Sequence, residues 1–213
     1  ISELKILESV LRSDEEKIKQ TIQDIDENAF EAAVEMILNA KKIYVIGIHS
    51  SAPLASFLTF YLNLMFPNVV QIQTNNSSEV FEQMLRIGSE DVIIGISFPR
   101  YSMRTLKALE YANTKQARII TLTDSIHSPM NMYSSCNLIA KSDMASIVDS
   151  LVAPLSVINA LVVSLCMKKQ DEVSKTMEQL EHIWDEYQVY EKDEIDPIDD
   201  RIKMPYLKTK EQK

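Results

Sequence analysis

Hydroxyl side chains collect directly after short apolar runs of this sequence, at points where a strand is expected to end. The segment His49-Ser50-Ser51 follows one such run, and the segment Ser97-Phe98-Pro99-Arg100-Tyr101-Ser102 follows another. A third hydroxyl-rich segment contains Thr123 and Ser128. Hydroxyl groups, together with the unpaired amides of a helix start, bind anions such as phosphate. The pattern predicts a phosphate or polyol site, although each serine taken singly also suits a helix cap.

The spacing of apolar residues predicts the elements that carry these hydroxyl groups. Short apolar runs rich in β-branched residues predict buried strands at 43–48, 69–73, 91–96, 118–122 and 136–140. Helical spacing predicts helices at 28–38, 52–65, 79–86, 102–113, 145–168 and 172–188. Strands that alternate with helices form a parallel sheet with helices on both faces, and such sheets bind ligands at the carboxyl ends of their strands. We therefore expect a three-layer α/β/α sandwich around a five-stranded parallel sheet, flanked by N- and C-terminal helices.

The two ends of the chain are expected to lie outside this sandwich. Residues 3–25 have helical spacing, with an expected break at 13–16 where Ser, Asp and two Glu residues resemble a new helix start. The predicted division is a helical linker over 1–27, a ligand-binding domain over 28–190 and a charged arm over 191–213. The chain begins with Ile1 and shows no signal-peptide pattern there, so a fragment of a longer protein is expected.

Composition argues against several classes of function. The net charge of −9 disfavours direct binding of nucleic acid. Residues 151–167 are apolar but interrupted by Pro154 and polar side chains, which predicts a core helix and no membrane span. The apolar stripe of that helix either forms a dimer contact or covers the sheet. Cys136 and Cys166 fit no metal spacing, so reduced thiols are expected, with no metal and no cofactor.

The loop sequences resemble a known family. They lack the glycine patterns of dinucleotide and triphosphate sites and the G-x-S-x-G nucleophile turn. The resemblance is to the SIS (sugar isomerase) domain, in the variant that is the effector domain of RpiR-type transcriptional regulators, and it covers residues 30–170. The segments that carry it are Gly47-Ile-His-Ser-Ser51, Asp91-Val-Ile-Ile-Gly-Ile-Ser-Phe-Pro-Arg-Tyr-Ser102, and Ile119-Ile-Thr-Leu-Thr-Asp124 with Ser128-Pro129.

The resemblance assigns roles to individual hydroxyl groups. It implies that Ser51, beside Ser50, contacts a sugar phosphate, and that Ser97 and Ser102 form the two ends of a phosphate loop. By the same resemblance Thr123 lies near the sugar ring, and Ser146 contacts a sugar hydroxyl.

Two residues depart from the pattern of the family's enzymes. His49 stands where they usually have glycine, and it either hydrogen-bonds the ligand or faces solvent. Arg100 lies in a segment that is usually richer in glycine, and it either pairs with phosphate or bridges to an acidic residue of a second subunit.

Two functions remain open at this point. The first is a sugar-phosphate sensor that forms part of a cytoplasmic transcriptional regulator. It would be a homodimer or tetramer, and it would contact DNA only through an N-terminal helix-turn-helix that this chain does not include. The second is an aldose–ketose isomerase of a phosphorylated sugar, for which Glu79, His49 and Asp149 are candidate bases. Since none of these forms an evident acid–base pair, no catalytic residue is assigned and the sensor is preferred.

Overall fold

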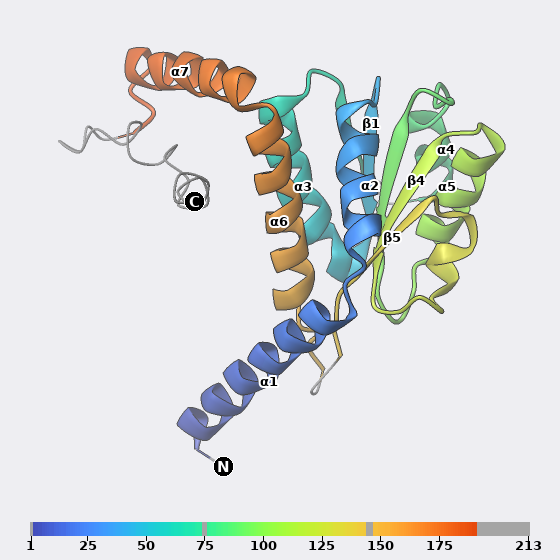
Figure 1. The fold of residues 1–213 in the computed structure, drawn as a ribbon, viewed down its shortest axis with the longest axis vertical. Helices are drawn as coiled ribbons and strands as arrows, with labels where there is room; N and C mark the ends of the chain where they lie inside the picture. The colour runs from blue at the N-terminus through green and yellow to red at the C-terminus, as the bar shows by residue number, and fades with distance from the viewer. Residues whose placement is uncertain (1, 74–75, 144–146, 191–213) are drawn as a thin grey trace, which may run out of the picture. The chain divides into compact units, whose positions relative to one another are not determined.

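A parallel five-stranded sheet forms the centre of the fold in the computed structural model, which describes residues 2–73, 76–143 and 147–190 (Figure 1). The strand order is β2-β1-β3-β4-β5. All neighbouring strands pair in parallel, with Gly47 opposite Ile96 at the end of the central pair. The strands are β1 (Ile43–Gly47), β2 (Val69–Ile72), β3 (Val92–Ile96), β4 (Arg118–Thr123) and β5 (Cys136–Ile139).

Helices cover both faces of this sheet, which confirms the predicted three-layer class (Figure 1). On one face α2 (Glu27–Leu38) packs on β5, and α3 (Ala52–Met65) packs on β1 and β2. The helix α6 (Val152–Lys168) packs against α2 and α3, and α1 (Glu3–Asp24) packs against α6. The opposite face carries α4 (Ser77–Gln83) and α5 (Met103–Thr114).

The chain divides into two compact units, Ile1–Lys168 and Lys169–Lys213. The first contains the sheet and its covering helices. In the second, α7 (Gln170–Glu186) has no buried residue. Within the described ranges no single helix is long and apolar enough to cross a membrane, and only α6 and α7 taken together reach such a length and composition.

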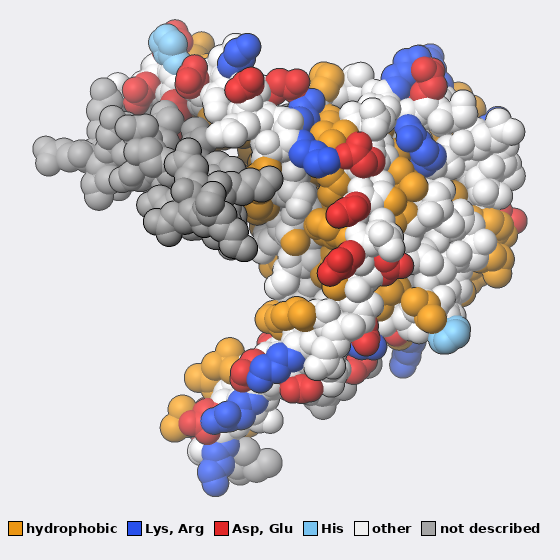
Figure 2. All heavy atoms as spheres, in the orientation of Figure 1, with side chains coloured by type: hydrophobic (Ala, Val, Ile, Leu, Met, Phe, Trp, Pro, Cys, Tyr) orange, Lys and Arg blue, Asp and Glu red, His pale blue; other side chains and the backbone are white. Residues whose placement is uncertain are grey.

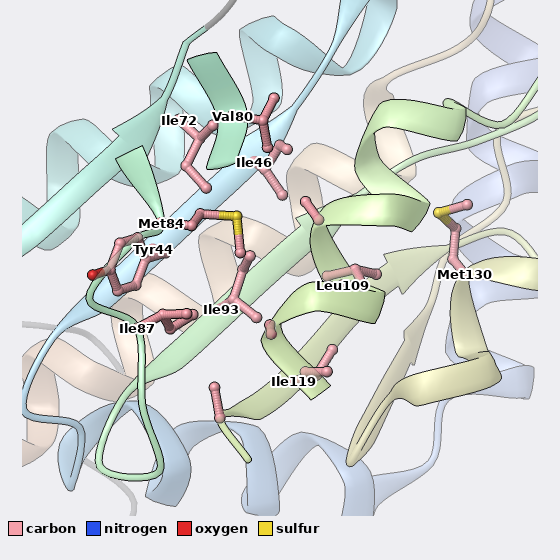
Figure 3. Close-up of a cluster of buried hydrophobic side chains, with 13 residues drawn as sticks. Tyr44, Ile46, Ile72, Val80, Met84, Ile87, Ile93, Leu109, Ile119 and Met130 are labelled. Carbon is pink, nitrogen blue, oxygen red and sulfur yellow. The ribbon is translucent and has the colours of Figure 1, made fainter. Parts of the chain in front are cut away.

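A buried apolar cluster joins the sheet to α4 and α5 (Figure 3). Ile46 and Ile93 contribute from the sheet, Met84 from the end of α4 and Leu109 from α5, and each of them is almost fully buried. Burying one such side chain contributes roughly 1.5–3 kcal/mol. This packing holds the strand ends, and therefore the loops that follow them, in fixed positions.

The largest departures from the predicted helices lie in α1 and at the start of α6, while α4 and α7 are shifted by two or three residues. The helix α1 runs unbroken through residues 13–16, because Ser13 accepts a hydrogen bond from Lys17 Nζ at 2.6 Å and Glu15 pairs with Lys19 one turn later at 2.8 Å. The helix α6 begins at Val152, and the described residues 147–151 are not helical. Pro154 explains this start, since proline fits the first turn of a helix and breaks its interior.

The apolar stripe of α6 is turned into the protein. Ile158, Leu161 and Leu165 are at most 2% exposed, and α6 packs on α2 and α3. The stripe therefore covers the core, and it does not indicate a dimer contact. Both cysteines are free thiols, and burial raises the pKa of Cys136 to about 11.

Candidate functional site

The strand order places the two serine-bearing segments next to each other. Because β1 and β3 are neighbours, the loops that follow them enclose one pocket of about 310 Å³, which we call the serine pocket. The order reverses direction between β1 and β3, and parallel sheets bind ligands at such a reversal. The residues that line the serine pocket are Ile48, His49, Ser50, Ser51, Ser97, Phe98, Arg100, Tyr101, Ser102, Met103 and Arg104.

The loop after β1 is a tight turn that leads into α3. Position 47 requires glycine, because a Cβ there would lie 2.6 Å from the carbonyl oxygen of Ser51. His49 has φ = 55°, in the left-handed region that favours glycine. This conformation explains why glycine is the usual residue at its position in the family's enzymes.

The Ser51 hydroxyl is available to a ligand. Ser51 stands at the N-cap position of α3 but makes no capping hydrogen bond with its side chain. Although it is only 3% exposed, it lines the serine pocket. Helix capping is therefore not the role of this serine.

The loop after β3 holds two serine hydroxyls with their protons free. Ser97 Oγ accepts a hydrogen bond from the Ser102 amide at 3.0 Å, and Ser102 Oγ accepts one from the Thr105 amide at 3.3 Å. Ser102 thus caps α5. A hydroxyl that accepts from an amide still has its own O–H to donate. Both protons therefore remain available for an anion at the start of α5, where the helix dipole also favours negative charge.

Two arginines give the serine pocket its charge. Arg100 and Arg104 line it, and no Asp or Glu does so among the residues that the structure describes. Arg104 lies in the first turn of α5, where a cation is unfavourable next to the helix dipole. An arginine at this position suits an anionic ligand, although the loop sequences by themselves did not point to Arg104.

A second polar pocket of about 400 Å³ adjoins the serine pocket on the β2 side. Both pockets are lined by His49 and Arg104, and the second also by Ser56, Gln71 and Gln73. Gln71 Nε2 donates to Ser56 Oγ at 2.8 Å. Arg104 can therefore contact a ligand in either pocket.

One predicted site residue, Thr123, is not brought into the serine pocket. Thr123 is fully buried, and its hydroxyl donates to Ser128 Oγ at 2.9 Å, so in this structure it organises the loop after β4 without being accessible to a ligand. Ser146 lies outside the described residues.

A hydrogen bond ties the loop after β3 to the loop after β4. The Tyr101 hydroxyl donates to Asp124 Oδ1 at 2.7 Å. Burial, together with this bond, raises the pKa of Tyr101, so the phenol stays protonated at neutral pH. The bond fixes one wall of the serine pocket.

Comparison with known proteins agrees with this geometry. The sequence model of the SIS domain matches residues 36–164, which is more than half of the chain. An uncharacterised HTH-type transcriptional regulator of Haemophilus influenzae is 24% identical over 164 residues, covering 75% of this chain and 56% of the regulator. The chain spans between 46% and 63% of the length of the curated relatives it matches.

Solved structures give the same result. The sugar isomerase domain of an RpiR transcription factor from Sphaerobacter thermophilus is 26% identical with a TM-score of 0.78, over 82% of this chain and 97% of that one. The NanR protein of Vibrio vulnificus, solved in complex with ManNAc-6P, is 20% identical with a TM-score of 0.73, over 84% and 69%. Structures with this fold also include a phosphoheptose isomerase, at 14% identity.

The matched segment 36–164 contains the whole sheet and both loops of the serine pocket. The resemblance inferred from those loops is confirmed, and the chain belongs to the SIS domain family.

Proposed function

We propose that this chain is the sugar-phosphate-sensing effector domain of a transcriptional regulator of sugar metabolism. The observation that carries the proposal is the convergence of Ser51, Ser97 and Ser102 with Arg100 and Arg104 on one pocket at the start of α5. This set of hydroxyl donors, helix amides and guanidinium groups suits a phosphate. The HTH-type regulators among its relatives support the regulatory role.

The serine pocket favours binding over isomerisation. Moving a proton between adjacent carbons needs a base within hydrogen-bond reach of the substrate. Among the described residues, His49 is the one candidate base that lines this pocket, and its side chain is exposed. Glu79 lies on α4, and Asp149 lines a different pocket.

The helix α1 supplies a route by which ligand binding acts on a distant part of a regulator. The segment after β5 is bound directly to α1, because the Lys141 amide donates to Thr21 Oγ1 at 3.0 Å and Ser150 Oγ donates to Asp14 Oδ1 at 2.5 Å. Lys141 also pairs with Asp24 at 3.1 Å. If the segment after β5 adopts two positions, a ligand with a higher affinity for one of them shifts the segment toward that position. Because α1 is bound to the segment, α1 moves with it.

The proposal includes self-association and a cytoplasmic location. Figure 2 shows apolar side chains on the N-terminal half of α1, where Leu4, Leu7, Val10 and Leu11 are exposed. Apolar residues on one exposed helix favour pairing with a second copy, and symmetric dimers are the commonest assembly. DNA would be contacted through a helix-turn-helix outside this chain, and the regulator would act in the cytoplasm.

A thermal-shift screen of phosphorylated sugars tests the proposal. A ligand at 100 times its Kd stabilises the folded state by about 2.7 kcal/mol, which raises the Tm of a domain of this size by roughly 5–10 °C. We expect such a shift with at least one phosphosugar and none with its unphosphorylated form. Failure of every phosphosugar to exceed inorganic phosphate would overturn the proposal, and turnover of a phosphosugar would favour the isomerase.

The variant Arg104→Gln should change stability and binding in opposite directions. Without ligand we expect it to be more stable by about 0.3–1 kcal/mol, because a cation leaves the first turn of α5. The Kd for the phosphosugar should rise roughly 10- to 100-fold, since hydrogen bonds to charged groups contribute about 1.5–3 kcal/mol. Lys107→Gln removes the same charge from an exposed position of α5 and should leave Kd unchanged. Equal Kd values for the two variants would contradict a role of Arg104 in binding.

A further inference from the structure

An acidic pocket adjoins the serine pocket on the side of β4 and β5. Its volume is about 220 Å³, and the two pockets share Arg100 as a lining residue. We call it the acidic pocket. The residues that line it are Pro99, Arg100, Asp124, Ser142, Asp143 and Asp149.

Its carboxylates are arranged around a space larger than an ion. Asp124 accepts the hydrogen bond from Tyr101, whereas Asp143 and Asp149 form no ion pair within the described ranges. Among the described residues, Arg100 is the one cation that lines the acidic pocket. No three His, Cys, Asp or Glu side chains of the described residues are close enough to hold a metal ion. The arrangement therefore suits a polyatomic group.

A buried serine independently points to a ligand in this pocket. Ser142 is 4% exposed and lines the acidic pocket. Within the part of the chain that the structure describes, its hydroxyl makes no hydrogen bond with the protein, and its oxygen is not fully buried. A ligand hydroxyl in the acidic pocket would supply the missing partner.

We infer that the acidic pocket binds the end of the sugar phosphate that lies opposite the phosphate, and that its charge selects among ligands. It accepts ends with hydroxyl or ammonium groups, and it excludes ends with a second anion, as in phosphorylated sugar acids and sugar bisphosphates. The inference rests on the proposed function, because the phosphate must occupy the serine pocket.

The charges of the two pockets give the physical reason. Ionised carboxylates accept hydrogen bonds from hydroxyl or ammonium donors, and such bonds are stronger than neutral ones. A second anion between Asp143 and Asp149 meets like charges, which costs several kcal/mol at a contact surface. Arg100 lines both pockets, so its single positive charge is shared with the serine pocket and does not offset this repulsion fully. Exclusion of the wrong charge is a common way to obtain specificity.

Two open-chain probes test this selectivity directly. Sorbitol 6-phosphate and 6-phosphogluconate have the same length and the same phosphate, and they differ in a hydroxymethyl against a carboxylate at the far end. We expect the wild-type chain to bind sorbitol 6-phosphate at least tenfold more tightly, with Kd taken from the concentration dependence of the Tm shift. In the double variant Asp143→Asn/Asp149→Asn the preference for sorbitol 6-phosphate should fall to threefold or less. The reason is that this variant binds 6-phosphogluconate more tightly than the wild type does.

A matched double variant separates this local effect from net charge. Glu31→Gln/Glu110→Gln removes the same two charges from exposed positions of α2 and α5, and it should keep the wild-type preference. Equal or tighter binding of 6-phosphogluconate by the wild type, or an unchanged preference in the Asp143/Asp149 variant, would overturn the inference. The inference would also be overturned if neither probe bound while another phosphosugar did. Failure of all phosphosugars would instead overturn the proposed function.

Discussion

Replacing Ser102 with aspartate should abolish sugar-phosphate binding while leaving the fold intact. Aspartate caps a helix as well as serine does, and its charge is favourable at a helix start. The Tm of the unliganded variant should therefore equal or exceed that of the wild type. The same carboxylate occupies the proposed phosphate position and removes the Ser102 O–H donor. Like charges in contact cost several kcal/mol, so Kd should rise about 100-fold or more.

Three variants make this result specific. Ser2→Asp makes the identical change at the N-cap of α1, outside the serine pocket, and should leave Kd unchanged. Ser102→Thr retains both the cap and the hydroxyl and should bind nearly as well as the wild type. Ser102→Ala loses the cap and should be less stable by about 1 kcal/mol. Retention of phosphosugar affinity by Ser102→Asp would show that the phosphate does not bind at the start of α5.

Gly47→Ala should reduce both stability and ligand affinity. The new Cβ would lie 2.6 Å from the Ser51 carbonyl oxygen and 3.0 Å from Ala55 Cβ, so the start of α3 must move. Overpacking of this kind costs about 1–3 kcal/mol, which corresponds to a fall in Tm of roughly 2–12 °C. Affinity should fall at least tenfold because the Ser51 hydroxyl moves with the backbone. Differential scanning calorimetry and ligand titration measure the two effects.

Gly95→Ala provides the matched comparison. Its Cβ would meet Leu109 Cδ2 at 2.9 Å, which is the end of a flexible side chain and lies in the core cluster. The Leu109 side chain can rotate, so we expect a smaller loss of stability than for Gly47→Ala. The Kd of the folded protein for the ligand should be unchanged. If the two alanine variants lost affinity equally, the close approach of Gly47 to Ser51 would not be what positions the site.

Several site residues have conformations or charges that lower local stability. His49 adopts a positive φ, Arg104 opposes the helix dipole, and Ser51 leaves α3 without a side-chain cap. Each is locally unfavourable, and all three line the serine pocket. Departures from local rules are expected where function requires them. The opposite effects predicted for Arg104→Gln on stability and binding follow from this conflict.

Local sequence patterns were enough to predict the elements and the kind of site. The β-branched run at 43–48 predicted β1, and helical spacing at 28–38 predicted α2, which Asp26 caps by accepting from the Ala29 amide at 3.1 Å. The serines at 97 and 102 predicted an anion site at a helix start. These features were predictable because propensity, capping and strand alternation act over a few residues.

Which residues come together in space depends on long-range packing. The neighbouring strands β1 and β3 are not consecutive in the sequence, so their pairing follows from long-range packing. That pairing joins the loops of Ser51 and Ser102 in one pocket, whereas Thr123 is buried at the end of β4 and does not line it. Asp124 and Asp149 likewise face one cavity from segments far apart in the chain. Residue spacing cannot encode these meetings, because they depend on how the core packs.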